Sequence, residues 1–164
     1  MYMVKGFKFL FLISIVLLVY SCQSTIYLVR HAEKQSEADA ALLSEIGLQR
    51  AQRLKNWMFD KHIDSVFAST YVRTQQTAQP TATYYRKSLT IYHPDTSALL
   101  VHNLSRLSKT CLIVGHTTNI PVMIRELTQH HISIGLNEFS NIYILKTKRC
   151  LFKKRTTLQV AHFE

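Results

Sequence analysis

The sequence predicts an α/β fold, a three-layer α/β/α sandwich with a mostly parallel central sheet. Short runs of apolar and β-branched residues alternate with longer segments of helical periodicity, which is the element order of parallel sheets. The run Cys111-Leu112-Ile113-Val114 is solidly apolar, as expected of a strand covered on both faces. A chain of 164 residues, 47% apolar and 18% charged, suits one globular domain.

The first 21 residues are expected to lie outside this domain. Two lysines precede the apolar run Phe9–Tyr20, which ends at Ser21-Cys22. This is the layout of a secretory signal. The run is about a dozen residues, shorter than the roughly 17 to 25 of a spanning helix. An uncleaved membrane anchor is the alternative interpretation. A small residue before a cysteine resembles a bacterial lipoprotein signal, which implies export, lipidation of Cys22 and a membrane-anchored domain over 22–164, on the periplasmic or outer-membrane side.

The first strand is expected over residues 25–29, and it runs directly into Arg30 and His31. Residues 34–42 follow as a polar surface loop. A second strand over 63–69 leads into a helix that carries Arg73 in its first turn. Free N–H groups and the helix dipole make such a helix start favourable for an anion.

The remaining elements follow from periodicity and capping. Ser44 is expected to cap a helix of about four turns, and Pro80 to kink or loosen the next helix unless that helix is short. Third and fourth strands are expected over 89–92 and 111–114, the latter ending at Gly115-His116. A final antiparallel pair is expected over 141–146 and 156–160. The apolar positions expected to face the sheet are Leu48, Ala51, Leu54 and Met58, then Leu100, Leu104 and Leu107, then Ile120, Met123, Ile124 and Leu127.

The net charge of +10 suits an anionic partner, an anionic lipid surface, or simply a solvated exterior. Five cations lie between the last two predicted strands. A charged hairpin that protects a sheet edge is the favoured interpretation, ahead of a binding surface. Nucleic acid is not an expected partner. Cys111 is expected to be a buried free thiol.

Three strand ends thus deliver candidate groups: Arg30 with His31, then Arg73, then His116. Because parallel strands share one carboxyl edge, these side chains are expected to converge. One guanidinium group can donate two parallel hydrogen bonds to phosphoryl oxygens, and a phosphoryl group in transfer spreads its charge over three oxygens. The convergence therefore predicts a phosphoryl site.

Four segments in order resemble the motifs of the histidine phosphatase superfamily, the phosphoglycerate mutase-like family, in its short phosphatase branch. They are Leu28-Val29-Arg30-His31-Ala32-Glu33, Leu43-Ser44-Glu45-Ile46-Gly47, Ala68-Ser69 with Arg73-Thr74 and Thr77-Ala78, and Val114-Gly115-His116. The resemblance runs from Ile26 to about Tyr143. It implies that His31 is the nucleophile that becomes phosphorylated, and that Arg30, Arg73 and His116 hold the phosphoryl oxygens.

The resemblance also asks for a general acid between Arg73 and His116, where Asp95 is the only carboxylate. Glu33 is a weaker alternative, and a helix-capping role for Asp95 competes. Some short members similar to phosphohistidine phosphatases lack an obvious acid, which suits good leaving groups. Thr117 is expected to line the pocket. The scheme requires no metal or organic cofactor, and the other histidines lack metal-ligand spacing.

The resemblance thus implies an exported, histidine acid phosphatase-like hydrolase of phosphoric monoesters, or of phosphoramidates, acting through a phosphohistidine. Its expected partner is a phosphorylated small molecule or a phosphoprotein. The alternative is a noncatalytic surface lipoprotein that uses the same pocket to bind phosphate or another anion.

Overall fold

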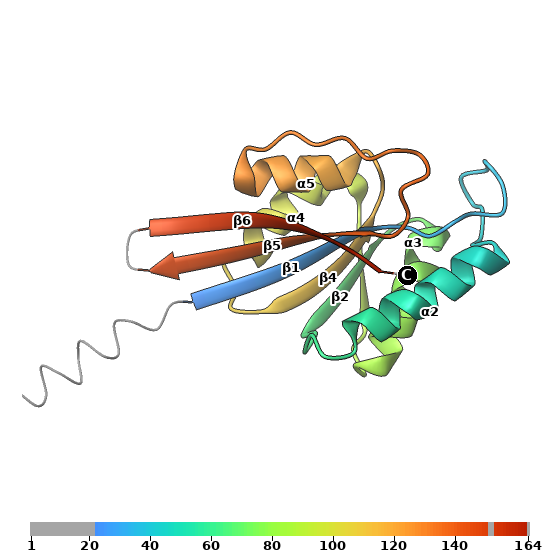
Figure 1. Ribbon diagram of the computed structural model, residues 1–164, viewed down its shortest axis with the longest axis horizontal. Coiled ribbons are helices and arrows are strands. Elements are labelled where there is room, and N and C mark those ends of the chain that lie inside the picture. The colour runs from blue at the N-terminus through green and yellow to red at the C-terminus, as the bar shows by residue number, and fades with distance from the viewer. Residues whose placement is uncertain (1–21, 151–152, 164) are drawn as a thin grey trace, which may run out of the picture.

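The computed structural model describes residues 22–150 and 153–163, so the predicted signal over residues 1–21 lies outside the described part. One six-stranded sheet, in the order β3-β2-β4-β1-β5-β6, forms the centre of the molecule (Figure 1). The first four strands in this order are mutually parallel, and β5 runs antiparallel to both of its neighbours, β1 and β6. The predicted α/β fold with a mostly parallel sheet is confirmed. The strands are β1 (Cys22–Arg30), β2 (Ser65–Ser69), β3 (Leu89–Tyr92), β4 (Thr110–Gly115), β5 (Asn141–Cys150) and β6 (Lys153–His162).

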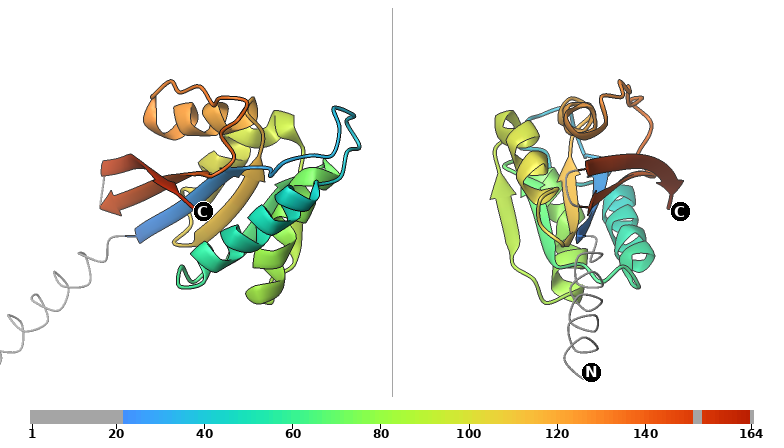
Figure 2. Two further views of the ribbon diagram at one scale, coloured as in Figure 1. Left: turned by 45° about the vertical axis from the view of Figure 1, so that its right-hand side comes forward. Right: turned by 90° about the vertical axis from the view of Figure 1, so that its left-hand side faces the viewer.

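Helices cover both faces of the sheet, which gives the three layers (Figure 2). Helices α2 (Glu45–Met58) and α3 (Val72–Tyr84) pack on one face. Helices α4 (Ser97–Leu104) and α5 (Asn119–Thr128) pack on the other, and the short η1 (Pro94–Thr96) precedes α4. Among the residues described, no helix has the length and apolar character needed to cross a membrane.

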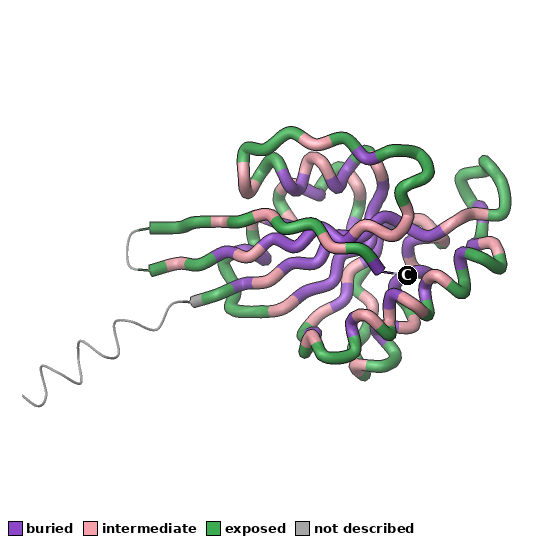
Figure 3. Tube along the Cα trace, viewed as in Figure 1, coloured by how far each residue is buried: buried purple, intermediate pink, exposed green. Residues whose placement is uncertain are grey.

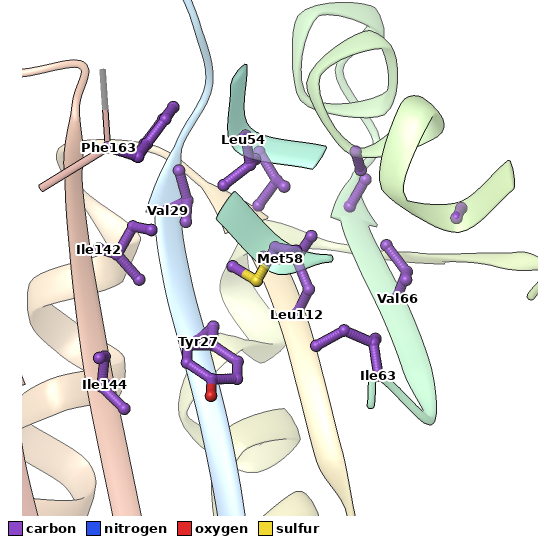
Figure 4. Packing of buried hydrophobic residues seen from close by; sticks show 14 residues of the cluster. Tyr27, Val29, Leu54, Met58, Ile63, Val66, Leu112, Ile142, Ile144 and Phe163 are labelled. Atoms are coloured by element: carbon purple, nitrogen blue, oxygen red, sulfur yellow. The ribbon is translucent and has the colours of Figure 1, made fainter. Parts of the chain in front are cut away.

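The core consists of two apolar layers, one on each side of the sheet. Leu54 and Met58 of α2 pack against Val29 of β1, together with residues of β2, β4 and β5 (Figure 4). The alternate residues of the same strands, such as Leu28, face α4 and α5. Because successive side chains point to opposite faces, a strand buried on both sides must be apolar throughout. This explains the unbroken apolar runs of β1 and β4.

Helix α2 begins as the sequence predicts, since the Ser44 hydroxyl accepts a hydrogen bond from the Gly47 N–H at 3.1 Å. Its buried residues include Ala51, Leu54 and Met58, also as predicted. Leu48 was expected to face the sheet, but it is 48% exposed. Gly47 lies directly against the backbone of Glu33 and takes the inward position, which turns the next residue about 100° away.

The expected kink at Pro80 stays a prediction, and the expected inward face of the following helix needs correction. Helix α3 continues to Tyr84, past Pro80, although a proline in a helix interior loses one backbone hydrogen bond. The buried side chains of Thr77, Thr81 and Ala82 hold this part of α3 on the sheet. Helix α4 ends at Leu104, so Leu107 lies beyond it and is 46% exposed.

Candidate active site

A cavity of about 580 Å³ opens where β1 and β4 end and α3 begins. Five residues predicted from the sequence line it: Arg30, His31, Arg73, His116 and Thr117. The rings of His31 and His116 are close, with centroids 5.3 Å apart. The expected convergence of strand ends is therefore what the fold produces.

His31 is the first residue after β1, and its backbone N–H donates to the Gly115 carbonyl at 2.9 Å. Its ring Nδ1 lies 2.8 Å from the Ala32 carbonyl oxygen, which can only accept a hydrogen bond. Nδ1 therefore carries the proton, and in the neutral ring Nε2 keeps its lone pair. Burial lowers the pKa of His31 to about 4, assisted by the charges of Arg30 and Arg73 and opposed by the Ala32 hydrogen bond. The His31 ring is thus neutral at neutral pH, with its proton on Nδ1 and a lone pair on Nε2.

Arg30 is held by one of its terminal nitrogens. Nη1 donates to the carbonyl oxygens of Gly135 and Leu136 at 3.0 and 2.6 Å, and the guanidinium lies 4.1 Å from the centre of the Phe139 ring. Nε of Arg30 is buried and has no hydrogen-bond partner. The arginine is therefore fixed in place with a donor still to be satisfied.

Arg73, in the first turn of α3, is held in the same way. Its Nη1 donates to the Asp39 carbonyl at 2.7 Å, and its guanidinium lies 4.4 Å from the centre of the Tyr71 ring. Its Nε is also buried without a partner. Both arginines thus use Nη1 to bind the protein, and each keeps a buried Nε donor without a partner. A phosphoryl group can satisfy such donors in pairs.

His116 is held by a chain of hydroxyl groups. Its Nε2 lies 2.8 Å from the Ser69 hydroxyl, which lies 2.9 Å from the Thr74 hydroxyl. Thr74 donates its proton to the Tyr71 carbonyl at 2.7 Å, so Ser69 must donate to Thr74 and accept from His116. Burial lowers the pKa of His116 to about 3, assisted by the positive field of His31, Arg73 and Arg30.

The backbone of His116 is fixed as well. Its N–H donates to the Asn119 side-chain oxygen at 2.7 Å, and the Asn119 amide donates to the Tyr92 hydroxyl at 3.1 Å. A Cβ on Gly115 would lie 2.6 Å from that same Asn119 oxygen. Gly115 is therefore needed for close approach, which is the role that the sequence predicts for it.

None of the nearby carboxylates is poised as a proton donor. Asp95, the predicted general acid, is not among the residues lining the cavity; its side chain is 88% exposed and lies 3.3 Å from the His93 ring. Glu33 lines the cavity, but hydrogen bonds from Arg50 hold its pKa below the usual 4.5 although burial alone would raise it. Glu37 pairs with Lys34 at 2.7 Å, which also lowers its pKa.

Several residues of the site were given no role from the sequence, although Ser69 stands in one of the four motifs. Ser69 ends β2 at the same edge as His31, and a buried hydroxyl at a strand end is the signal that could have found it. Tyr71 and Phe139 stack on the two arginines, and the 135–136 carbonyls bind Arg30. No group of three or more His, Cys, Asp or Glu that could hold a metal occurs within the described residues.

Comparison with known proteins finds one family match, over part of the chain. Residues 26–93 match the histidine phosphatase superfamily (branch 1). The matched segment contains Arg30, His31 and Arg73 and ends before His116. No curated protein sequence matches the chain.

Solved structures with histidine phosphatase folds superpose on most of the chain. The protein histidine phosphatase SixA complexed with tungstate has a TM-score of 0.66 at 15% identity, covering 84% of this chain and 96% of its own. Mycobacterial glucosyl-3-phosphoglycerate phosphatase has a TM-score of 0.68 at 12% identity, with 84% and 98% covered. Phosphoserine phosphatase from Entamoeba histolytica, complexed with phosphoserine, has a TM-score of 0.63 at 16% identity, with 85% and 96% covered. At these identities the likeness establishes the phosphoglycerate mutase-like fold.

Proposed function

We propose that the chain is a phosphatase of the histidine phosphatase superfamily that transfers a phosphoryl group to His31 and then to water. The observation that carries the proposal is that His31, with Nε2 free, shares one cavity with Arg30 and Arg73, each of which keeps a buried unsatisfied Nε. A positioned nucleophile and fixed cations are what phosphoryl transfer requires, since its catalysis rests on alignment and charge stabilisation.

In the first step Nε2 of His31 attacks phosphorus, the bond from phosphorus to the leaving group breaks, and the leaving group departs with the bonding electrons. In the second step water attacks the phosphohistidine, releasing inorganic phosphate and one proton and regenerating neutral His31. Arg30, Arg73 and His116 bind the phosphoryl oxygens in both steps. Their positions are set before substrate arrives, so little reorganisation is needed in the transition state.

The substrate class follows from the carboxylates. Glu33 and Glu37 both have lowered pKa values, which disfavours their protonated forms, and Asp95 is not among the residues that line the cavity. A leaving group that departs without a proton from the enzyme is therefore favoured. We propose phosphoramidates, such as a phosphohistidine side chain, or activated phosphate esters, over alkyl phosphates. The sequence-based prediction of Asp95 as general acid receives no support from its position.

We also propose that the domain is exported and anchored through a lipid on Cys22. The support is the order of two lysines, an apolar run and Ser21-Cys22 in the sequence, which lies ahead of the described fold. A substrate reached from this location would be outside the cytoplasm.

The test compares the full chain with His31→Ala and with His102→Ala, a matched control whose histidine lies on the surface of α4 and pairs with Glu126. Phosphoramidate, an aryl phosphate and an alkyl phosphate are supplied in turn, with and without a chelator, and phosphate release is measured. We expect turnover in that order of preference, unaffected by chelator, absent in His31→Ala and retained in His102→Ala.

Acid-labile, alkali-stable label should also be trapped on the full chain and not on His31→Ala. Turnover that survives in His31→Ala would contradict the proposed nucleophile. A folded chain that neither turns over nor acquires the label, yet binds phosphate, would be the anion-binding lipoprotein instead.

A further inference from the structure

The β5–β6 hairpin carries six cations toward its far end, away from the active site. They are Lys146, Lys148, Arg149, Lys153, Lys154 and Arg155, here called the hairpin cluster. Neither strand contains an acidic residue. The far part of the hairpin is largely exposed (Figure 3). The cluster therefore puts positive charge on both faces of the hairpin end, with Lys148 and Arg155 on one face and Arg149 and Lys154 on the other.

The register of the hairpin places like charges against each other. Lys148 is directly opposite Arg155, and Arg149 is directly opposite Lys154. Like charges at directly opposed positions destabilise a strand pair. No ion pair among the described residues involves the cluster. Arg149 and Lys154 instead donate to uncharged oxygens, the Arg106 carbonyl at 2.9 Å and the Ser105 hydroxyl at 3.0 Å.

Protection of a sheet edge explains only part of this arrangement. β6 is the edge strand, and lysines on an edge strand prevent pairing with other chains. Lys148 and Arg149 lie on β5, whose other side is already paired with Gln23 and Cys22 of β1. An interior strand needs no such protection. A local arrangement that costs stability without a structural return points to a function.

The start of β1 indicates what the anionic partner is. The backbone of Cys22 pairs with Arg149, so the described domain begins beside the hairpin cluster (Figure 1). In the sequence the apolar run Phe9–Tyr20 immediately precedes this point, and the proposed lipid on Cys22 would replace it as the apolar anchor once the run is cleaved. An apolar anchor and a polybasic patch together give membrane attachment that neither gives alone.

We propose that the hairpin cluster docks on an anionic lipid surface. β1 extends nine residues from Cys22 to Arg30, a distance of about 30 Å at the usual rise of a strand. The docked domain would therefore hold its cavity roughly that far from the lipid, open to soluble substrates. This surface is independent of the phosphatase chemistry, because none of its residues lines the cavity.

The experiment uses the full chain with vesicles of phosphatidylcholine alone, and with vesicles in which about one lipid in three is phosphatidylglycerol. The ratio of the two partition coefficients isolates the charge-dependent part of vesicle binding, because the apolar run contributes equally to both coefficients. Lys148→Glu and Arg149→Glu are the test variants. Lys87→Glu is the matched control, an exposed residue before β3 at the opposite edge of the sheet.

We expect the ratio to fall about fivefold or more in each test variant, and to change by less than about twofold in Lys87→Glu. Lys148→Glu also places a glutamate opposite Arg155, so its urea midpoint should rise, whereas Arg149→Glu loses the hydrogen bond to the Arg106 carbonyl. Turnover of a soluble phosphoramidate should be unchanged, which separates this proposal from the proposed function.

A wild-type ratio near one, or a ratio that both test variants retain, would overturn the proposal. So would tight binding of a duplex oligonucleotide that is lost in the variants while vesicle partition persists, because the cluster would then be a nucleic-acid surface.

Discussion

Ser69→Ala tests whether the hydroxyl chain behind His116 supports catalysis. Ser69 is fully buried and accepts a hydrogen bond from His116 Nε2 at 2.8 Å. Alanine removes that acceptor, and also the donor to Thr74. His116 is itself only 8% exposed, so its ring N–H would lose its partner within the protein. Ser69 touches no substrate in this scheme and acts as a positioning residue.

The magnitude follows from the cost of an unsatisfied buried donor, which is about 1–3 kcal/mol. That amount should appear as a decrease in the free energy of unfolding. Because the same hydrogen bond orients His116 toward the phosphoryl group, a similar amount should be lost from transition-state stabilisation. This corresponds to a decrease of about fivefold to 150-fold in kcat/KM.

The assay pairs urea unfolding with phosphoramidate hydrolysis, and uses Ser24→Ala as its control. Ser24 is also buried and donates one hydrogen bond, to the Leu104 carbonyl at 3.2 Å, but it lies seven residues before His31 on the extended chain, about 23 Å away. We expect both variants to lose stability and only Ser69→Ala to lose activity. If Ser69→Ala is destabilised yet keeps kcat/KM within about twofold, the positioning role is refuted.

Two further predictions concern pH and packing. The free energy of unfolding should fall as pH decreases from about 6.5 toward 4. The reason is that His31 and His116 bind protons in the unfolded state over this range, whereas in the folded state their lowered pKa values, about 4 and about 3, keep them neutral. The double variant His31→Gln/His116→Gln should flatten this dependence in urea unfolding, and an unchanged slope would contradict the pKa shifts. Gly47→Ala should lower the unfolding free energy by about 1–3 kcal/mol, because its Cβ would overlap the Glu33 carbonyl; Gly135→Ala, where the neighbour is the flexible Glu138 carboxylate, should lose clearly less in the same measurement.

The positions of Arg30, His31 and His116 were predictable because they depend on strand ends. Apolar runs locate strands, and the parallel order brings their carboxyl ends to one edge. Arg73 followed from the same logic, since a helix must begin after β2. These positions need no knowledge of side-chain contacts.

The contacts that hold Arg30 could not be predicted. The Gly135 and Leu136 carbonyls and the Phe139 ring come from a segment without periodic pattern, and its path is set by tertiary packing. For Asp95, the sequence order predicted a place in the site that the fold does not produce. Sequence order made it the only carboxylate between Arg73 and His116, but the turn at η1 places its side chain in solvent.

Burial, assisted by the charges of the cavity, keeps its two histidines neutral, and a bound substrate changes those charges. Glu33 and Glu37 are each neutralised by a cation of their own, which leaves Arg30 and Arg73 as uncompensated charges beside His31 and His116. A bound phosphoryl dianion offsets the positive field that assists burial in lowering the pKa of His116, so phosphate binding and protonation of His116 favour each other. His31 must remain neutral to attack, and its Nε2 becomes bonded to phosphorus instead of to a proton. The two histidines are therefore suited to opposite roles by the hydrogen bonds each already makes, to the Ala32 carbonyl and to Ser69.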